Sequence, residues 1–123
     1  MKIILDAMGG DNAPDEIVKG AAQAVAENRD NLTLVLVGNE EIIRASAAKQ
    51  NIALDEHFEI VNTTQTIEMC DEPAKAIRAK KDSSMVVGLR MLAEGKGDAF
   101  VSAGSTGALH VGASLIVRTI KGV

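Results

Sequence analysis

Short apolar runs alternate with segments of helical periodicity along the whole chain. Apolar and β-branched runs at residues 2–5, 31–39, 58–62 and 98–104 predict four strands. The intervening and following segments carry apolar residues three or four positions apart, which is the spacing of one helix face. These segments predict helices over residues 14–27, 40–50, 73–80, 84–94 and 106–120. Pro14, with two acidic residues directly after it, is a typical helix start.

This order of elements predicts an α/β fold. The strands are apolar nearly throughout, which is typical of a parallel sheet covered by helices on both faces. We therefore expect residues 1–123 to form a single Rossmann-like α/β domain of this kind. Because the sequence stops just after a helix, where another strand normally follows, we also expect the domain to be the N-terminal part of a larger fold.

Composition narrows the class of protein and of partner. Hydrophobic residues make up 46% of the chain and charged residues 24%, as in ordinary soluble globular proteins. Aromatic residues are only 2% and the net charge is -4, so we expect no nucleic-acid partner. No stretch approaches the roughly 20 apolar residues of a membrane span, and the N-terminus does not resemble a secretory signal. We expect a cytoplasmic protein.

Candidate chemistry gathers in two glycine-rich loops, each between a predicted strand and the next helix. The first reads DAMGGDNAP from Asp6, and the second reads VSAGSTGALH from Val101. Ligands of open parallel sheets bind beyond the carboxyl ends of the strands, where both loops would lie. Neither loop contains the dinucleotide fingerprint or the P-loop lysine pattern. The two histidines, His57 and His110, lack metal-ligand spacing, so we expect no metal site.

The two loops differ in charge. Asp11, Asp15 and Glu16 in and after the first loop would repel a phosphate, whereas no Asp or Glu occurs from residue 99 onward. A helix N-terminus attracts anions, and hydroxyls and open glycine amides can bind them. We therefore expect phosphate to bind the second loop, at Ser102, Gly104, Ser105, Thr106 and Gly107. The alternative is that Ser105 only caps its helix and that the glycines only turn the chain.

A basic segment, KAIRAKKDSSM, lies between the two loops. Lys75, Arg78 and Lys81 would fall within roughly a third of a helix circumference, with Lys80 beside them. The polar residues 82–84 can cap the next helix. Such a patch suits an acidic partner or an anionic ligand. On charge pattern alone, a solvated helix face is the commoner explanation.

Together, DAMGGDNAP, DEPAKAIRAKKDSSM and VSAGSTGAL resemble in order and spacing the N-terminal half of the bacterial phosphate acyltransferase (PlsX) family. The resemblance covers essentially the whole chain. It implies a fold similar to phosphotransacetylases and isocitrate/isopropylmalate dehydrogenases, with a second lobe beyond this chain. It also implies conversion of acyl-[acyl carrier protein] and inorganic phosphate to acyl phosphate and free carrier protein. The acyl phosphate then serves a membrane glycerol-3-phosphate acyltransferase in phospholipid biosynthesis.

The resemblance further implies partners and residue roles. Members of the family work as cytoplasmic homodimers, can associate peripherally with the inner face of the cell membrane, and need no metal or redox cofactor. Acidic carrier protein would dock on Lys75, Arg78, Lys80 and Lys81. The catalytic positions of the first loop would be Asp6, Gly9, Gly10 and Asn12. There, the glycine amides would meet the oxyanion that develops on the thioester carbonyl.

Two other functions remain open. One is an acyltransferase of the same fold that uses a short acyl-CoA and phosphate. The other is a truncated, non-catalytic domain that binds phosphate or carrier protein. The second function is open because the resemblance places part of the cleft in the second lobe.

Overall fold

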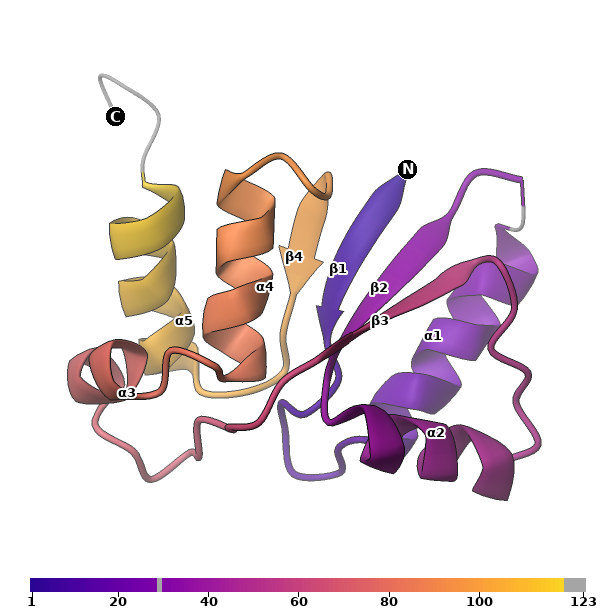
Figure 1. Ribbon diagram of the computed structural model, residues 1–123, viewed down its shortest axis with the longest axis horizontal. Helices are drawn as coiled ribbons and strands as arrows, with labels where there is room; N and C mark the ends of the chain where they lie inside the picture. Colours follow the sequence, from indigo (N-terminus) through magenta and orange to yellow (C-terminus); the bar gives the residue numbers. More distant parts are fainter. Residues whose placement is uncertain (29, 119–123) are drawn as a thin grey trace.

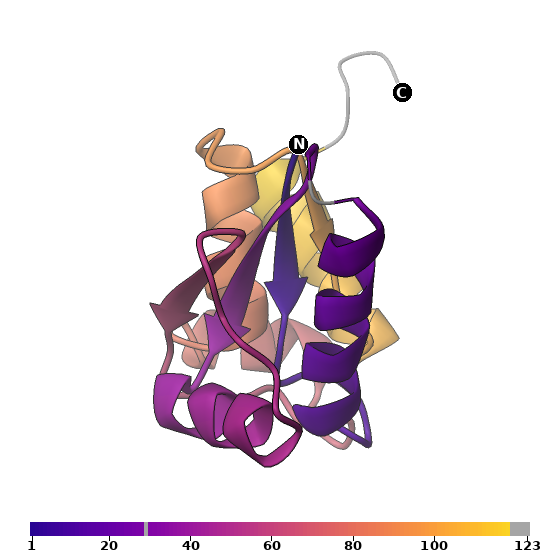
Figure 2. The same ribbon diagram turned by 90° about the vertical axis from the view of Figure 1, so that its right-hand side faces the viewer.

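Four parallel strands form the centre of the molecule, with helices on both faces (Figures 1 and 2). The computed structural model describes residues 1–28 and 30–118. The order across the sheet is β3-β2-β1-β4. The strands are β1 (Lys2–Asp6), β2 (Thr33–Gly38), β3 (Phe58–Asn62) and β4 (Ala99–Val101). The predicted parallel α/β fold is therefore confirmed.

The helices follow the predicted periodicity closely. They are α1 (Asp15–Glu27), α2 (Glu40–Lys49), α3 (Pro73–Ala79), α4 (Ser84–Ala93) and α5 (Thr106–Gly112). After α5 the chain continues as a π-helical segment, η1 (Ala113–Val117). The end of the helix predicted over residues 106–120 lies outside the described residues. The strand predicted over 98–104 is shorter than expected, because its last residues turn into the loop described below.

The alternation of side chains along the strands divides the core into two layers. Leu34 and Leu36 pack with α1 and α2 on one face, and Val35 and Val37 pack with α4 on the other. All four are buried. Helix α5 packs against α3 and α4 (Figure 1). This two-sided burial explains why the strands read as continuous apolar runs.

Side-chain caps fix where four of the helices begin. In each case a polar side chain just before the helix accepts a hydrogen bond from a backbone N–H of the first turn, which otherwise has no helical partner. The capping residues are Asn39 for α2, Glu72 for α3, Ser83 for α4 and Ser105 for α5.

Helix α1 is held in a different way. Its first residue, Asp15, accepts hydrogen bonds from Lys49 and from Ser46, both at 2.6 Å, so that it joins α1 to α2. These bonds hold the pKa of Asp15 below its usual value. Their contribution to stability is therefore complete above the ordinary carboxyl pKa and is lost as the pH falls through the lower folded-state value.

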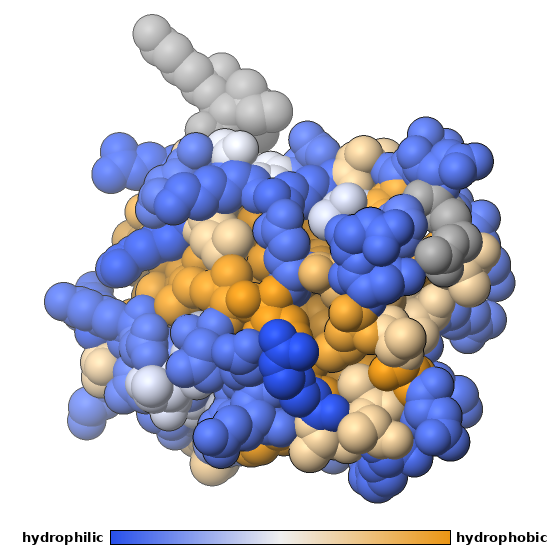
Figure 3. Space-filling view, turned by 45° about the vertical axis from the view of Figure 1, so that its right-hand side comes forward, coloured by the Kyte–Doolittle hydropathy of each residue, from blue (hydrophilic) through white to orange (hydrophobic). Residues whose placement is uncertain are grey.

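The helices do not cover the sheet completely. Figure 3 shows apolar atoms in the middle of one side of the molecule, framed by hydrophilic ones. A groove between β3 and α4 is lined in part by Val61, Val87 and Met91. On β4, Val101 is 50% exposed. Within the part of the chain that the structure describes, no helix has the length and apolar character needed to cross a membrane.

Close packing of α4 on β4 depends on Gly88. A Cβ atom at this position would lie 2.2 Å from a ring carbon of Phe100. We expect Gly88→Ala to lower the free energy of unfolding by about 1–3 kcal/mol, measured by urea denaturation. The matched control is Gly20→Ala in α1, where nothing lies within 4 Å of the added carbon. That change should raise the stability by about 0.5–1 kcal/mol, and equal effects of the two would contradict this packing.

Candidate functional site

The loops predicted to carry chemistry meet at one edge of the sheet. Strands β1 and β4 are neighbours, with Leu5 opposite Val101, so the loops that follow them lie side by side. The loop after β1 leads to α1 and the loop after β4 leads to α5, which lie on opposite sides of the sheet (Figure 1). Such a switch point at the carboxyl ends of parallel strands is the usual ligand-binding position of this architecture.

A buried carboxylate joins the two loops to α4. Asp6, at the end of β1, is 2% exposed. It accepts hydrogen bonds from the Ser84 hydroxyl at 2.6 Å, the Ser102 hydroxyl at 2.8 Å and the Met8 backbone N–H at 3.0 Å. Asp6 is therefore occupied within the protein, and its carboxylate positions the surrounding backbone instead of facing a ligand.

The glycines allow the two loops to approach closely. A Cβ atom on Gly9 would lie 2.8 Å from the Asp6 carboxylate and 2.9 Å from the Gly104 amide nitrogen. Gly10 has a φ of 99°, a left-handed conformation that favours glycine, and packs against Ala103. These glycines therefore bring the backbones of the two loops together.

The second loop is partly occupied by its own hydrogen bonds. The Ser105 hydroxyl accepts from the Ala108 N–H, so the alternative reading of Ser105 as a helix cap is confirmed. Ser102 donates to Asp6 and accepts from the Gly104 N–H. Three of the positions expected to bind phosphate, Ser102, Gly104 and Ser105, therefore each already make a hydrogen bond within the protein.

What remains accessible is the start of α5. Thr106 and Gly107 are both exposed. Their N–H groups belong to the first helical turn, where no helix carbonyl is available to accept from them. Gly107 also lies against the first residue of α3, because an added Cβ would be 2.7 Å from Cγ of Pro73. The basic helix α3 thus adjoins the start of α5.

The predicted basic patch is smaller than expected. Lys80 donates to the Asp71 carboxylate at 2.7 Å and to the Thr66 carbonyl at 2.9 Å, so it is not a free surface charge. This pairing and the backbone N–H of Glu68 hold the pKa of Asp71 below its usual value. Helix α3 ends at Ala79, so Lys81 lies beyond it.

Three basic residues of this segment are exposed: Lys75, Arg78 and Lys81. The shared helix face predicted for them holds for the first two, which lie three positions apart in α3.

The acidic residues of the first loop fall into two groups. Asp11, Asn12 and Glu16 are exposed, so they remain available to a ligand or to solvent. Asp15 is paired with Lys49, so its negative charge is offset and the first loop repels a phosphate less than the sequence predicted. Among the residues that the structure describes, no three His, Cys, Asp or Glu side chains converge to hold a metal ion.

Sequence reasoning missed the bond between Ser84 and Asp6. Ser84 was predicted only to help cap a helix, and that cap is provided by Ser83. The two bonded residues are 78 positions apart, so no local pattern links them. Only a parallel sheet that places α4 over β1 brings them together.

Comparisons with known proteins agree on a family. The family described as "Fatty acid synthesis protein" matches residues 1–123. The phosphate acyltransferase of Caldicellulosiruptor bescii is 54% identical over 123 residues, which are 100% of this chain and 36% of that protein. The phosphate acyltransferase of Clostridioides difficile is 48% identical over 124 residues, 100% of this chain and 35% of that protein. The chain therefore spans about a third of the length of these relatives.

A solved structure supports the fold. The EutD phosphotransacetylase from Staphylococcus aureus superimposes with a TM-score of 0.67 at 21% sequence identity. The match covers 100% of this chain and 39% of that one. At this identity the likeness establishes the shared architecture and leaves the reaction to other arguments.

The Asp6 cluster gives a testable stability effect. We expect Asp6→Ala to lower the free energy of unfolding by about 3 kcal/mol, because hydrogen bonds to a charged group are lost and two hydroxyls are left without their acceptor. Urea denaturation would measure this loss. The control is Asp11→Ala in the same loop, an exposed position where the change should stay within about 0.5 kcal/mol. Equal effects at the two positions would show that the buried carboxylate does not hold the loops.

Proposed function

Because this chain belongs to the family of fatty acid synthesis proteins whose curated relatives are named phosphate acyltransferases, we propose that it is the N-terminal part of such an enzyme. The proposed reaction converts acyl-[acyl carrier protein] and inorganic phosphate to acyl phosphate and free carrier protein, for phospholipid biosynthesis. The observation that supports it most is the meeting of an acidic glycine loop and a carboxylate-free glycine loop at the switch point between β1 and β4.

The phosphate is proposed to bind at the start of α5. The free N–H groups of Thr106 and Gly107, with the Thr106 hydroxyl, could hold its oxygens without neutralising it. No carboxylate occurs in the described part of the chain after Asp98. Ser102, Gly104 and Ser105 would support this subsite from behind, because their polar groups are already bonded within the loop.

The thioester is proposed to lie over the first loop. A phosphate oxygen attacks the thioester carbonyl carbon, the carbonyl oxygen becomes an oxyanion, and the C–S bond breaks as the carbonyl re-forms. The released thiolate takes up a proton. The Gly9 and Gly10 N–H groups have no acceptor among the described residues and could donate to the oxyanion. Asn12 and Asp11 would border an uncharged thioester, which they do not repel.

Carrier protein is proposed to dock beside the phosphate subsite. Acidic carrier protein would meet Lys75, Arg78 and Lys81, which are exposed, whereas Lys80 is paired with Asp71. The contact between Pro73 and Gly107 places this surface next to the start of α5. We further propose, from family membership alone, a cytoplasmic homodimer that associates peripherally with the membrane and passes its product to a glycerol-3-phosphate acyltransferase.

The reaction is tested by offering acyl carrier protein thioester, or a short acyl-CoA, together with phosphate, and trapping acyl phosphate with hydroxylamine. We expect product from the carrier-protein thioester, and we expect Thr106→Val to raise the KM for phosphate about three- to ten-fold through loss of one hydrogen bond. The control is Thr33→Val at the amino end of β2, whereas the loops follow the carboxyl ends of the strands. Product from acyl-CoA alone would favour the short-chain phosphotransacylase, and phosphate binding without product would favour a non-catalytic domain.

Docking is tested by charge reversal. The double variant Arg78→Glu, Lys81→Glu should weaken carrier-protein binding, and the remaining binding should depend less on salt because fewer charge pairs are screened. Surface plasmon resonance at two ionic strengths would measure both effects. Lys19→Glu, an exposed position on α1, is the matched control. Unchanged binding by the double variant would remove this patch from the proposal.

A further inference from the structure

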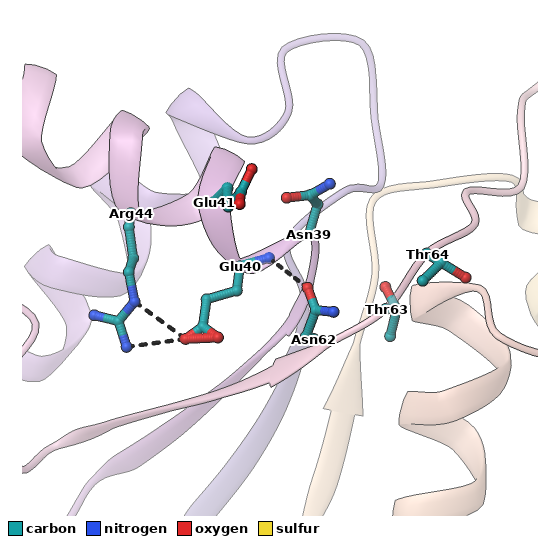
Figure 4. A pocket seen from close by; sticks show the side chains of 7 residues that line it. All are labelled: Asn39, Glu40, Glu41, Arg44, Asn62, Thr63 and Thr64. Carbon is teal, nitrogen blue, oxygen red and sulfur yellow. Dashed lines mark hydrogen bonds and ion pairs between the residues drawn. The ribbon is translucent and has the colours of Figure 1, made fainter.

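A pocket outside the site above lies on the other side of β1. It has a volume of about 530 Å³ and lies where β2 and β3 end and α2 begins (Figure 4). We propose that this pocket binds the pantetheine arm of the acyl donor, the neutral chain of amides and hydroxyl that carries the thioester in both coenzyme A and carrier protein. This inference rests on the proposed function, because only a thioester substrate brings such an arm.

A buried hydroxyl without a partner points to a ligand. Thr63 is 2% exposed, and its Oγ1 makes no hydrogen bond with any residue that the structure describes. Figure 4 shows this hydroxyl directed toward the space between Asn39 and Thr64. A buried polar group without a partner is costly, so such groups in folded proteins normally have one. A ligand atom in the pocket would supply it.

The other polar groups of the pocket offer hydrogen-bond donors. The Asn39 side-chain oxygen accepts from the Ile42 N–H, and the Asn62 side-chain oxygen accepts from the Glu40 N–H. Their NH₂ groups have no acceptor among the described residues and can donate. With the Thr63 hydroxyl, which both donates and accepts, they match the carbonyl and N–H groups of an amide chain.

The charge of the pocket selects against an anion. The start of α2 is already capped by Asn39 and carries Glu40 and Glu41 in its first turn. Glu40 pairs with Arg44 at 3.1 Å, whereas Glu41 is exposed and leaves the mouth of the pocket negative. A phosphate would meet repulsion here, but a neutral amide chain would not. The pocket therefore differs from the start of α5 in the ligand group that its charge favours: a neutral amide chain here and an anion there.

The pocket lies near the first glycine loop, with Met8 of that loop packed against the residue that precedes the pocket. Met8 packs over Gly38, the residue before Asn39, because a Cβ on Gly38 would lie 2.6 Å from Cγ of Met8. On the other side, Thr64 bonds Asp82 just before α4. From β1 to β3 is two strand spacings, about 10 Å. An extended arm with the length of about four residues spans roughly 13 Å, enough to reach from this pocket to the Gly9–Gly10 turn.

Thr63→Val tests the assignment without removing a bond that the fold uses. Because the Thr63 hydroxyl has no partner, we expect the stability of the variant to be unchanged or raised. Titrations of the ¹⁵N-labelled protein with pantetheine, coenzyme A and inorganic phosphate would be followed by NMR. We expect the first two to shift the Asn39, Asn62 and Thr63 amides. Thr63→Val should weaken both about three- to ten-fold, with phosphate binding unchanged. Thr33→Val is the matched control.

Holo- and apo-carrier protein distinguish the source of the contact. The holo form, which has the arm, should shift the pocket amides, and the apo form should leave them in place. Equal shifts by both, or wild-type pantetheine affinity in Thr63→Val, would overturn the assignment. Acyl phosphate formation is a separate readout: if Thr63→Val forms it with an unchanged KM for the acyl donor, the pocket assignment fails while the proposed reaction stands.

Discussion

The arrangement of the site depends on one buried carboxylate. Asp6 ends β1 and accepts hydrogen bonds from Ser84 and Ser102, which belong to α4 and to the loop after β4. These bonds fix the two glycine loops against each other at the switch point between β1 and β4, from which the chain leads to helices on opposite faces of the sheet. The backbone around Gly9 and Gly104 is therefore shaped before any ligand arrives, as electrostatic catalysis requires.

Elements and loops were predictable from sequence because their signals are local. The apolar periodicity located the strands and helices of the described residues, and the glycine-rich turns located both loops. The errors have specific physical causes. The strand predicted over 98–104 ends early because Ser102 turns toward Asp6, and Lys80 is unavailable because it reaches Asp71. The first contact joins residues 96 positions apart, and the second joins a helix end to the loop nine positions before it, so helix and strand periodicity shows neither.

The pocket beside β3 could not be predicted for the same reason. A threonine in TTQ carries no signal that its hydroxyl is buried without a partner. That property arises only when β3 is placed next to β2 and the following segment runs beside the start of α4. The sequence indicated the sheet edge at which we expect ligands, and the structure divides that edge into regions of different charge.

The partners of Asp6 also determine how strongly dissolved salt affects the arrangement of the two loops. Its carboxylate is held by hydroxyls and a backbone amide, and no ion pair among the described residues includes it. Contacts of this kind, shielded from water, are hardly weakened by dissolved electrolyte, whereas attraction between exposed charges is. The geometry around the two glycine loops should thus persist over a wide range of salt concentrations, even where the proposed encounter with a charged partner slows.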